Sequence, residues 1–356
     1  MAPQVQEPVL RRLRQGVVIP AHPLALTARR RLDERRQRAL TRYYLAAGAG
    51  GIAVGVHTTQ FAIRLKQHAL LRPVLALAAD TLNAQRTSEP VVRIAGVVGK
   101  TAQAAREAAL AADLGYHVVL VSLSALPRAT DEVLLNHLEA VADVLPVMGF
   151  YLQPAVGGRP LTYAFWRALC DRIASVVAIK VAPFDRYATL DVVRAVHDAG
   201  RLGEIALYTG NDDHIILDLL TTFRFGPRDQ ADPVRFAGGL LGQWAVWTKR
   251  AVGHLDQCRR AVRAQGAPLP RSLLTLAEQL TDANGAIFDA AHDFAGCIPG
   301  IHDVLRRQGL LRGTWCLDEN ETLSPGQREQ IDRVCTAYPH LTDDEFVADH
   351  LDEWLA

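Results

Sequence analysis

Eight short apolar runs rich in β-branched residues constrain the fold of this chain more than any other feature. Each run is followed by a longer segment with apolar residues at helical spacing, as in 100–115, 130–145 and 189–200. The runs are apolar throughout instead of alternating with polar residues, which is typical of strands buried on both faces of a parallel sheet. They occupy residues 16–22, 50–57, 91–98, 117–123, 146–152, 175–181, 204–210 and 234–240.

Eight strands that are each followed by a helix close most naturally into a barrel. An open doubly wound sheet would need a glycine-rich phosphate turn after an early strand. The sequence has neither GxGxxG nor GxxxxGK[ST], and its GAGG at 48–51 precedes a strand. We therefore predict an α/β fold, a TIM (β/α)8 barrel over residues 16–240. Long helical patterns with no strands between them predict that residues 241–356 form a helical extension packed on the outside of this barrel.

Composition limits the partners and the compartment. The net charge is +1, which gives no electrostatic reason to expect binding to nucleic acid or to an anionic membrane. No stretch approaches the roughly 20 apolar residues of a membrane span. The five cysteines are scattered, odd in number and without a CxxC pair, so we expect a reducing cytoplasm.

The carboxyl ends of the strands are where a barrel of this kind carries its active site. The polar residues and glycines at those ends are therefore the candidates: His22, His57, Thr58, Thr59, Gln60, Gly99, Ser122, Ser124, Tyr151, Gln153, Lys180, Gly210, Asn211, Asp212, Gly238 and Gly239. A metal site built from His22, His57 and His214 is an alternative, but these residues lack HxH or HExxH spacing, and we assign no metal ligand.

Lys180 lies near the centre of the apolar run SVVAIKVAPF (175–184) and is one of only four lysines in the chain. An amine inside a barrel mouth loses hydration, which lowers its pKa from about 10.4 towards neutrality. The neutral amine can attack a carbonyl carbon and form a Schiff base, which arginine cannot do. The competing interpretation is a lysine paired with a carboxylate or extending out of the barrel end.

Tyr151 ends the neighbouring fifth strand, so its hydroxyl could move protons during formation of an imine on the lysine. A barrel-wall tyrosine with a satisfied hydroxyl is the alternative. Thr58 and Thr59 offer adjacent hydroxyls and N–H groups suited to a substrate carboxylate, or they form a turn in which the hydroxyls bond local backbone. His57 could act as an acid or base or only as a hydrogen-bond donor.

Together these motifs resemble the dihydrodipicolinate synthase/N-acetylneuraminate lyase family over roughly residues 16–310. The segment YLQP (151–154) is similar to the family's Tyr-Asn-x-Pro motif, and VVAIKVA (176–182) to its Schiff-base lysine strand. LYTGNDD (207–213) is similar to its Gly-x-Asp turn after strand seven. The motifs occur in the family's order along the chain.

The resemblance implies a cofactor-free class I lyase, aldolase or dehydratase that acts on pyruvate or a related 2-keto acid and assembles as a homo-oligomer, a dimer or a tetramer. It implies that Lys180 forms the imine and that Tyr151 relays protons. The residues assigned to substrate binding are Thr58, Thr59, His57, Gln153, Gly210, Asn211 and Gly239.

Two departures from the family pattern leave the activity open. HTTQF (57–61) stands where the family has Gly-Thr-Thr-Gly-Glu, and VSLSALP (121–127) stands where its synthases carry Pro-Tyr-Tyr. The chain therefore has no counterpart of the tyrosine that neighbouring synthase subunits lend each other. These departures argue against lysine-pathway synthase activity and keep a second hypothesis, a barrel that binds a keto acid without turnover.

Overall fold

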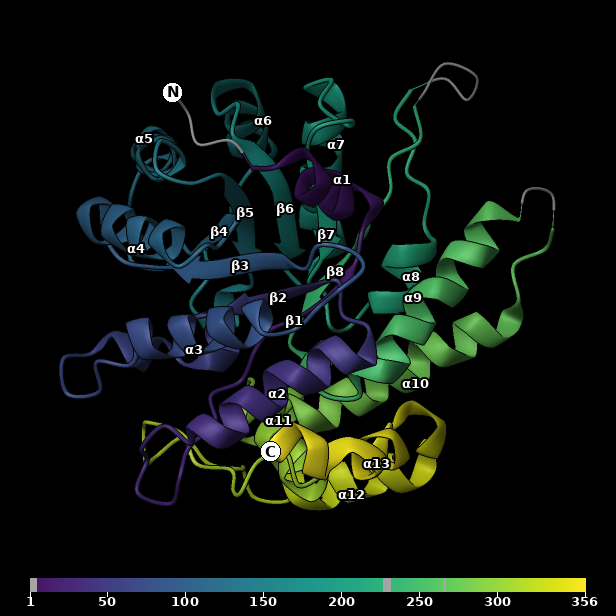
Figure 1. The fold of residues 1–356 in the computed structure, drawn as a ribbon. Coiled ribbons are helices and arrows are strands. Elements are labelled where there is room, and N and C mark those ends of the chain that lie inside the picture. The colour runs from purple at the N-terminus through teal and green to yellow at the C-terminus, as the bar shows by residue number, and fades with distance from the viewer. Residues whose placement is uncertain (1–4, 227–231, 265–266) are drawn as a thin grey trace.

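Eight parallel strands form one sheet that curls into a nearly closed barrel (Figure 1). The computed structural model describes residues 5–226, 232–264 and 267–356. The strands are β1 (Val18–Pro20), β2 (Gly51–Val54), β3 (Val92–Val97), β4 (Val118–Val121), β5 (Val147–Leu152), β6 (Val176–Ala182), β7 (Ala206–Thr209) and β8 (Gly238–Leu241). β1 pairs with β8, and a bridge between Ala21 and Ala53 joins β1 to β2. The predicted (β/α)8 barrel is confirmed, with one strand in each apolar run; only β8 lies largely at the end of its run.

A ring of eight helices surrounds the barrel, one after each strand. These helices are α2 (Glu34–Ala47), α3 (Leu71–Asn83), α4 (Thr101–Asp113), α5 (Asp131–Ala142), α6 (Tyr163–Arg172), α7 (Arg186–Asp198), α8 (Ile215–Leu220) and α9 (Thr248–Arg263). The last of them packs against α8, α2 and β1, so it belongs to the ring although it lies beyond the boundary predicted at residue 240. Nowhere in the described part of the chain is a helix both long enough and apolar enough to cross a membrane.

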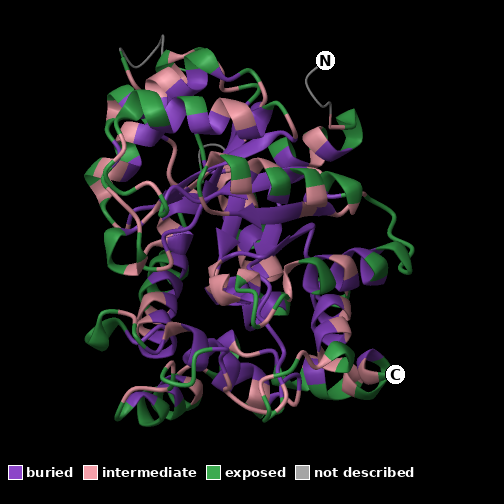
Figure 2. Ribbon diagram, turned by 90° about the vertical axis from the view of Figure 1, so that its left-hand side faces the viewer, coloured by how far each residue is buried: buried purple, intermediate pink, exposed green. Residues whose placement is uncertain are grey.

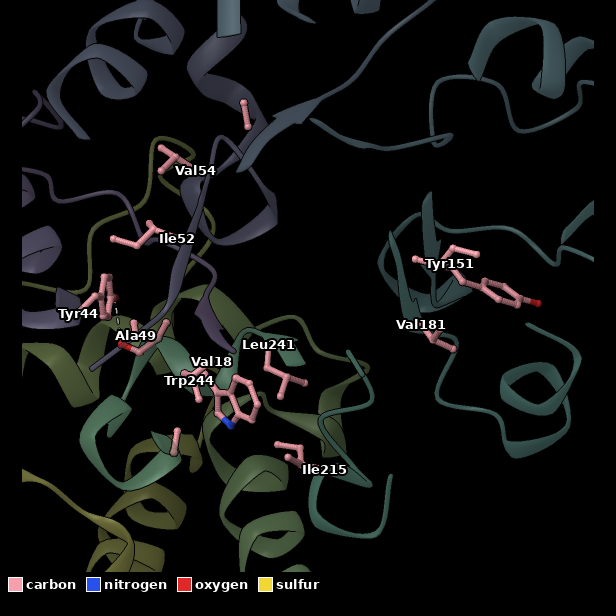
Figure 3. Packing of buried hydrophobic residues seen from close by; sticks show 14 of the residues in the cluster. Val18, Tyr44, Ala49, Ile52, Val54, Tyr151, Val181, Ile215, Leu241 and Trp244 are labelled. Carbon is pink, nitrogen blue, oxygen red and sulfur yellow. Dashed lines mark hydrogen bonds between the residues drawn. The ribbon is translucent and has the colours of Figure 1, made fainter. Parts of the chain in front are cut away.

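The strands are buried on both faces, as their uniformly apolar composition predicts (Figure 2). Side chains alternate between the barrel interior and the layer of helices because successive residues of a strand point to opposite sides. Met148, Ala178 and Tyr208 belong to the inner cluster. Val147 and Val181 belong to the outer cluster, which packs against the helices (Figure 3). This alternation decides which residues of β5 and β6 can reach a site inside the barrel.

The helix α1 (Glu7–Gln15) closes the end of the barrel at which the strands begin. Its buried residues Val9 and Leu13 share the inner cluster with Val17 and Val92. The hydroxyl of Tyr208 donates a hydrogen bond to the carbonyl oxygen of Leu13 over 2.8 Å. Within the described residues, α1 therefore blocks the end of the barrel at which the strands begin.

Four further helices follow the barrel ring: α10 (Arg271–Ile287), α11 (Cys297–Arg307), α12 (Gln327–Ala337) and α13 (Asp344–Leu355). They gather on one side of the molecule, below the barrel in Figure 1. α10 packs against α8, α11 and α12, and α13 packs against α2. The predicted helical pattern at 241–266 is realised as α9, except that residues 265–266 lie outside the described part of the chain.

Candidate active site

A pocket opens at the carboxyl ends of the strands, and Lys180 lies in its wall. The empty space in the pocket, including its open mouth, is about 750 Å³. Loops after most of the strands contribute to the lining, and so does the segment between α10 and α11. The lining residues are Ala21, Val56, His57, Thr58, Phe61, Gly96, Val97, Val98, Leu120, Ser122, Phe150, Leu152, Gln153, Val156, Lys180, Ala182, Phe184, Gly210, Asp212, Gly242, Phe288, Phe294 and Cys297.

Lys180 points into the barrel from β6, on the same face as Ala178 and Ala182. Burial lowers the pKa of its amine to about 8, although the nearby Asp212 and Cys297 act in the opposite direction. The Nζ atom lies 4.6 Å from the centre of the Phe150 ring, a favourable distance for a cation–π contact. Among the residues that the structure describes, no carboxylate forms an ion pair with Lys180 within 4.0 Å. An appreciable fraction of the amine is therefore neutral near pH 8.

Asp212 is the acidic side chain of this pocket, and it follows β7. Its Oδ1 atom accepts a hydrogen bond from the backbone N–H of Gln243 over 3.0 Å. Burial raises the pKa of its carboxyl group to about 7, while the bond to Gln243 and the charge of Lys180 oppose that rise. Burial thus shifts the pKa values of the amine and of the carboxyl group towards neutrality from opposite sides.

Gly210 lies against the lysine chain. A Cβ atom at this position would stand 2.6 Å from Cε of Lys180 and 2.8 Å from Cβ of Ala182. Real Cβ atoms essentially never approach other heavy atoms so closely. The absence of a side chain at Gly210 therefore leaves the space that the lysine occupies.

Tyr151 does not share the pocket with Lys180, contrary to the prediction. Tyr151 pairs in register with Val181, whereas Phe150 pairs with Lys180. The tyrosine ring faces the helix layer, 5.5 Å from the ring centre of Trp166 (Figure 3). Its hydroxyl accepts a hydrogen bond from the backbone N–H of Leu161 over 3.1 Å. The alternation of the strand gives the inward position to Phe150, which has no proton to transfer.

The two threonine hydroxyls after β2 are used by the backbone. Thr58 Oγ1 donates to the carbonyl oxygen of Ala21 over 2.8 Å. Thr59 Oγ1 donates to the carbonyl oxygen of His22 over 2.7 Å and accepts from the N–H of Gly55 over 2.9 Å. Thr58 lines the pocket, but Thr59 does not. The hydroxyls therefore hold the turn, as the alternative interpretation of this motif expected.

His57 and Gln153 also lie in the pocket wall. Burial and the neighbouring charge of Lys180 lower the pKa of the His57 imidazole to about 4. At neutral pH the ring is uncharged, so it can donate one hydrogen bond and accept another. Gln153 follows β5, and its side chain adds a neutral amide to this part of the wall.

Asn211 and Gly239 do not line the pocket, although both were assigned to substrate binding. The amide of Asn211 accepts from the N–H of Phe184 and donates to Thr189 and Asp218, so it supports the turn from behind. Gly239 faces the outer layer, where a Cβ atom would meet the ring of Trp244 at 2.7 Å. The pocket-lining glycines at this side are Gly210 and Gly242.

The three histidines of the metal-site alternative are not gathered into one set. Across residues 5–226, 232–264 and 267–356, no group of three His, Cys, Asp or Glu side chains could hold a metal ion. The imidazole of His22 lies 2.9 Å from both Thr41 Oγ1 and the amide nitrogen of Gln37. His22 therefore belongs to a buried hydrogen-bond network behind the barrel wall.

Several residues of the pocket could not be found from the strand ends. Phe61, Phe184, Phe288, Phe294 and Cys297 come from turns or from the segment after α10. Burial is the main cause that raises the pKa of the Cys297 thiol, which keeps it protonated. No periodic pattern marks these residues, because their positions depend on how distant segments meet. Asp212 was found from the sequence in two ways, as a polar residue at a strand end and as part of the Gly-x-Asp match.

Comparison with solved structures places this chain among proteins of one fold family. A dihydrodipicolinate synthase from Oceanobacillus iheyensis superposes with a TM-score of 0.72 at 15% identity, covering 94% of this chain and 100% of the other. YagE from E. coli K12, a prophage protein of the dihydrodipicolinic acid synthase family in complex with pyruvate, gives 0.70 at 19% identity, covering 91% and 97%. N-acetylneuraminate lyase from Fusobacterium nucleatum complexed with pyruvate gives 0.69 at 14% identity, covering 91% and 97%.

No protein-family model and no curated protein sequence match this chain. The chain nevertheless has the fold of the dihydrodipicolinate synthase and N-acetylneuraminate lyase structures over nearly its whole length. The resemblance noted in the sequence is thus confirmed for the fold.

Proposed function

We propose that this protein is a divergent member of that family, a class I lyase or aldolase that acts on pyruvate or a related 2-keto acid through a Schiff base on Lys180. The observation that carries the proposal is the position of Lys180: its amine lies inside the pocket, without an ion-pair partner among the described residues, and burial lowers its pKa to about 8. Two of the structures with this fold are described as complexes with pyruvate.

The neutral amine of Lys180 attacks C2 of the keto acid, and the carbonyl oxygen leaves as water when the iminium forms. Loss of a proton from C3 gives an enamine, because the iminium nitrogen accepts the electron pair of the broken C–H bond. The enamine carbon then forms a bond to the carbonyl carbon of an aldehyde, whose oxygen takes up a proton. Hydrolysis of the new iminium by water releases a 4-hydroxy-2-keto acid and restores the amine. Cleavage is the reverse sequence.

Asp212 is the group that we assign to proton transfer in place of Tyr151. It lines the same pocket as Lys180, and its raised pKa of about 7 lets it accept and return a proton near neutral pH. The ring at the inward position of β5 belongs to Phe150, and the hydroxyl of Tyr151 is bonded outside the barrel wall. The proton relay implied by the Tyr-x-x-Pro motif is therefore not part of the proposal.

The carboxylate of the keto acid is assigned to the turn His57–Thr59, of which His57 and Thr58 line the wall together with Gln153. Because both threonine hydroxyls and the N–H of Thr59 already donate to carbonyl oxygens, the donors that we assign to the carboxylate are the N–H of Thr58 and the neutral imidazole of His57. The first N–H groups of a helical turn have no partner within that turn, which makes them available to an anion.

Reductive trapping tests the proposal directly. The protein is incubated with pyruvate and then with borohydride, and the modified peptide is located by mass spectrometry. We expect one reduced adduct on Lys180, and none on Lys66, Lys100 or Lys249, whose residues are exposed. Lys180→Arg should abolish the adduct, whereas Lys249→Arg should leave it unchanged.

Lack of an adduct on Lys180 across a panel of 2-keto acids would overturn the proposal. Saturable keto-acid binding without any product would instead support the alternative of a barrel that binds but does not turn over. Activity lost on chelation would support the metal-dependent alternative. Assembly into a homo-oligomer and a cytoplasmic location stay predictions from the sequence.

A further inference from the structure

Phenylalanine is concentrated at this pocket to an unusual degree. The chain contains ten phenylalanines, and five of them line the pocket. They come from four separate parts of the chain: Phe61 after β2, Phe150 in β5, Phe184 after β6, and Phe288 and Phe294 between α10 and α11. Four segments thus place five aromatic rings around one cavity.

Two of these rings meet at the side of the pocket that the segment after α10 supplies. Phe184 and Phe294 lie edge to face, with ring centres 5.8 Å apart. Both residues have positive φ angles, 53° and 67°, which non-glycine residues adopt only when the surroundings hold them there. The N–H of Phe184 donates to Asn211 Oδ1 over 3.1 Å, and the N–H of Phe294 donates to the carbonyl oxygen of Asp289 over 3.0 Å. Hydrogen bonds therefore fix the backbone that carries each ring.

The empty space continues beyond these rings. A second hollow of about 350 Å³ is lined by Phe184, Phe288 and Phe294 as well as by Asp212, all of which also line the main pocket. Its remaining wall includes residues of α10, among them Gly285. A substrate whose reacting carbon lies at Lys180 can therefore extend a bulky group between the phenylalanine rings towards α10.

The charged groups of the pocket are few. Of the residues that line it in the described part of the chain, Lys180 and Asp212 are the only ones that carry charge at neutral pH, since His57 is uncharged. No arginine is among them. Both charged groups are already assigned to the chemistry at the carbonyl carbon. The second hollow also has Asp213, Thr281 and Asn284 in its wall, but the hydroxyl of Thr281 and the amide of Asn284 already donate to the carbonyl oxygens of Asp213 and Asp212. A chain of several hydroxyls placed between the rings would exchange its hydration for few free donors, whereas an aromatic ring would gain apolar contact.

We propose that the aldehyde partner of this enzyme, equivalently the part of the cleaved substrate beyond C4, is an aromatic or similarly bulky apolar group held by Phe184, Phe288 and Phe294. This inference rests on the proposed Schiff-base function and specifies its substrate class. Asp212 lines both the main pocket and the second hollow, so we assign to it the exchange of the proton on the oxygen of the aldehyde.

The test compares cleavage of two 4-hydroxy-2-keto acids, one with a phenyl group on C4 and one with a polyhydroxylated chain, by release of pyruvate. We expect kcat/KM to be at least about tenfold higher for the phenyl compound, the scale of discrimination that apolar contacts provide. Phe288→Ala should reduce kcat/KM for the phenyl compound by about tenfold and change the value for the polyhydroxylated compound less. Phe225→Ala removes a half-buried ring outside the pocket and is the matched control, with both values unchanged.

Each substrate is compared with itself in the variant and in the wild-type protein, so the difference in intrinsic reactivity between the two substrates does not affect the effect of Phe288→Ala. A preference of the wild-type protein for the polyhydroxylated compound would overturn the inference, and it needs no variant that might fail to fold. An equal loss for both compounds in Phe288→Ala, with an unchanged thermal unfolding temperature, would also overturn it. Trapping of pyruvate on Lys180 tests the Schiff-base function separately from the substrate class. If pyruvate is trapped but the phenyl compound is not preferred, only the proposed substrate class is wrong.

Discussion

Lys180 and Tyr151 face opposite sides of the barrel wall because Tyr151 lies one residue beyond the position on β5 that pairs with the lysine. Lys180 faces the pocket because Ala178 and Ala182, two residues to either side, share the inner face of β6. On β5 the residue in register with the lysine is Phe150, so Tyr151 faces the helices. Because side chains alternate along a strand, a shift of one residue places a side chain on the other face of the sheet. The YLQP motif (151–154) therefore has the spacing of the family motif along the chain, but its tyrosine does not line the pocket.

Gly210→Ala should disable the lysine without unfolding the protein. The new Cβ atom would lie 2.6 Å from Cε of Lys180, so the flexible lysine chain would have to move. A shift of this kind costs about 100-fold in rate when it displaces a reacting atom by roughly 1 Å. We expect that reduction in the rate of borohydride-trappable imine formation with pyruvate. Gly203→Ala, where a Cβ atom would meet nothing within 4 Å, is the control. Equal rates in the two variants would contradict the steric role of Gly210.

Asp212→Asn should separate imine formation from the later proton transfer. The charge of Asp212 raises the pKa of Lys180, which burial lowers to about 8. Removing that charge lowers the lysine pKa further, so the rise of imine formation with pH should shift to lower pH. Exchange of the C3 hydrogens of pyruvate with deuterium should fall by about 100-fold, because an amide cannot accept the proton. Proton NMR measures the exchange.

Asp113→Asn, at an exposed position at the end of α4, is the matched control and should change neither quantity. Exchange at the wild-type rate in Asp212→Asn would assign the proton transfer to another group. A shift of the imine profile to higher pH would contradict the electrostatic coupling of the two side chains.

Helices and connecting segments outside the eight strands cover one end of the barrel and line the pocket at the other end. α1 occupies the end where the strands begin, and the segment between α10 and α11 brings Phe288, Phe294 and Cys297 to the opposite end. The sequence indicated helices after residue 240 and placed them on the outside of the barrel. Their contribution to the pocket was not predicted, because helical spacing shows which face is apolar but not which element covers it.

Tyr208→Phe should weaken the closure by α1. The hydroxyl of Tyr208 is buried and donates to the carbonyl oxygen of Leu13, so its removal leaves that oxygen without this donor. Because the N–H of Gly16 still donates to the same oxygen, we expect the free energy of unfolding to fall by about 0.5–1.5 kcal/mol, the usual net contribution of one hydrogen bond. Denaturation by urea measures the change. Tyr187→Phe, at a residue that is 84% exposed, should have no effect. An unchanged midpoint for Tyr208→Phe would show that the bond contributes nothing to closure.

At the scale of the whole molecule, a buried carboxylate ties the C-terminal helices to the barrel ring. Asp343, just before α13, accepts hydrogen bonds from the hydroxyl of Tyr43 on α2 over 2.7 Å and from the N–H of Lys249 on α9 over 3.0 Å. It also accepts from the amide of Gln308 over 2.8 Å. Residues far apart in sequence thus meet at one group, which fixes the C-terminal helices against the ring.

Asp343→Ala should destabilise the protein strongly. The hydroxyl of Tyr43 and the N–H of Lys249 would lose this acceptor, whereas the amide of Gln308 would keep its bond to Asp344, and we expect a loss of about 3 kcal/mol in the free energy of unfolding. Asp349→Ala removes an exposed carboxylate of α13 and should change stability little. Thermal and urea unfolding of both variants measure the difference. Similar stability in the two variants would show that apolar packing alone holds the C-terminal helices.

The sequence by itself determined the architecture and the place of the lysine within it. Strands buried on both faces must be apolar throughout, so the eight runs and the lysine within β6 were visible in the chain. The same uniform burial hid which residues of β5 face inward, because Phe150 and Tyr151 are both suited to a buried position. Only the tertiary structure decided that, through the register of β5 with β6. It also brought Phe184 and Phe294 together, since contacts between distant turns leave no periodic pattern in the sequence.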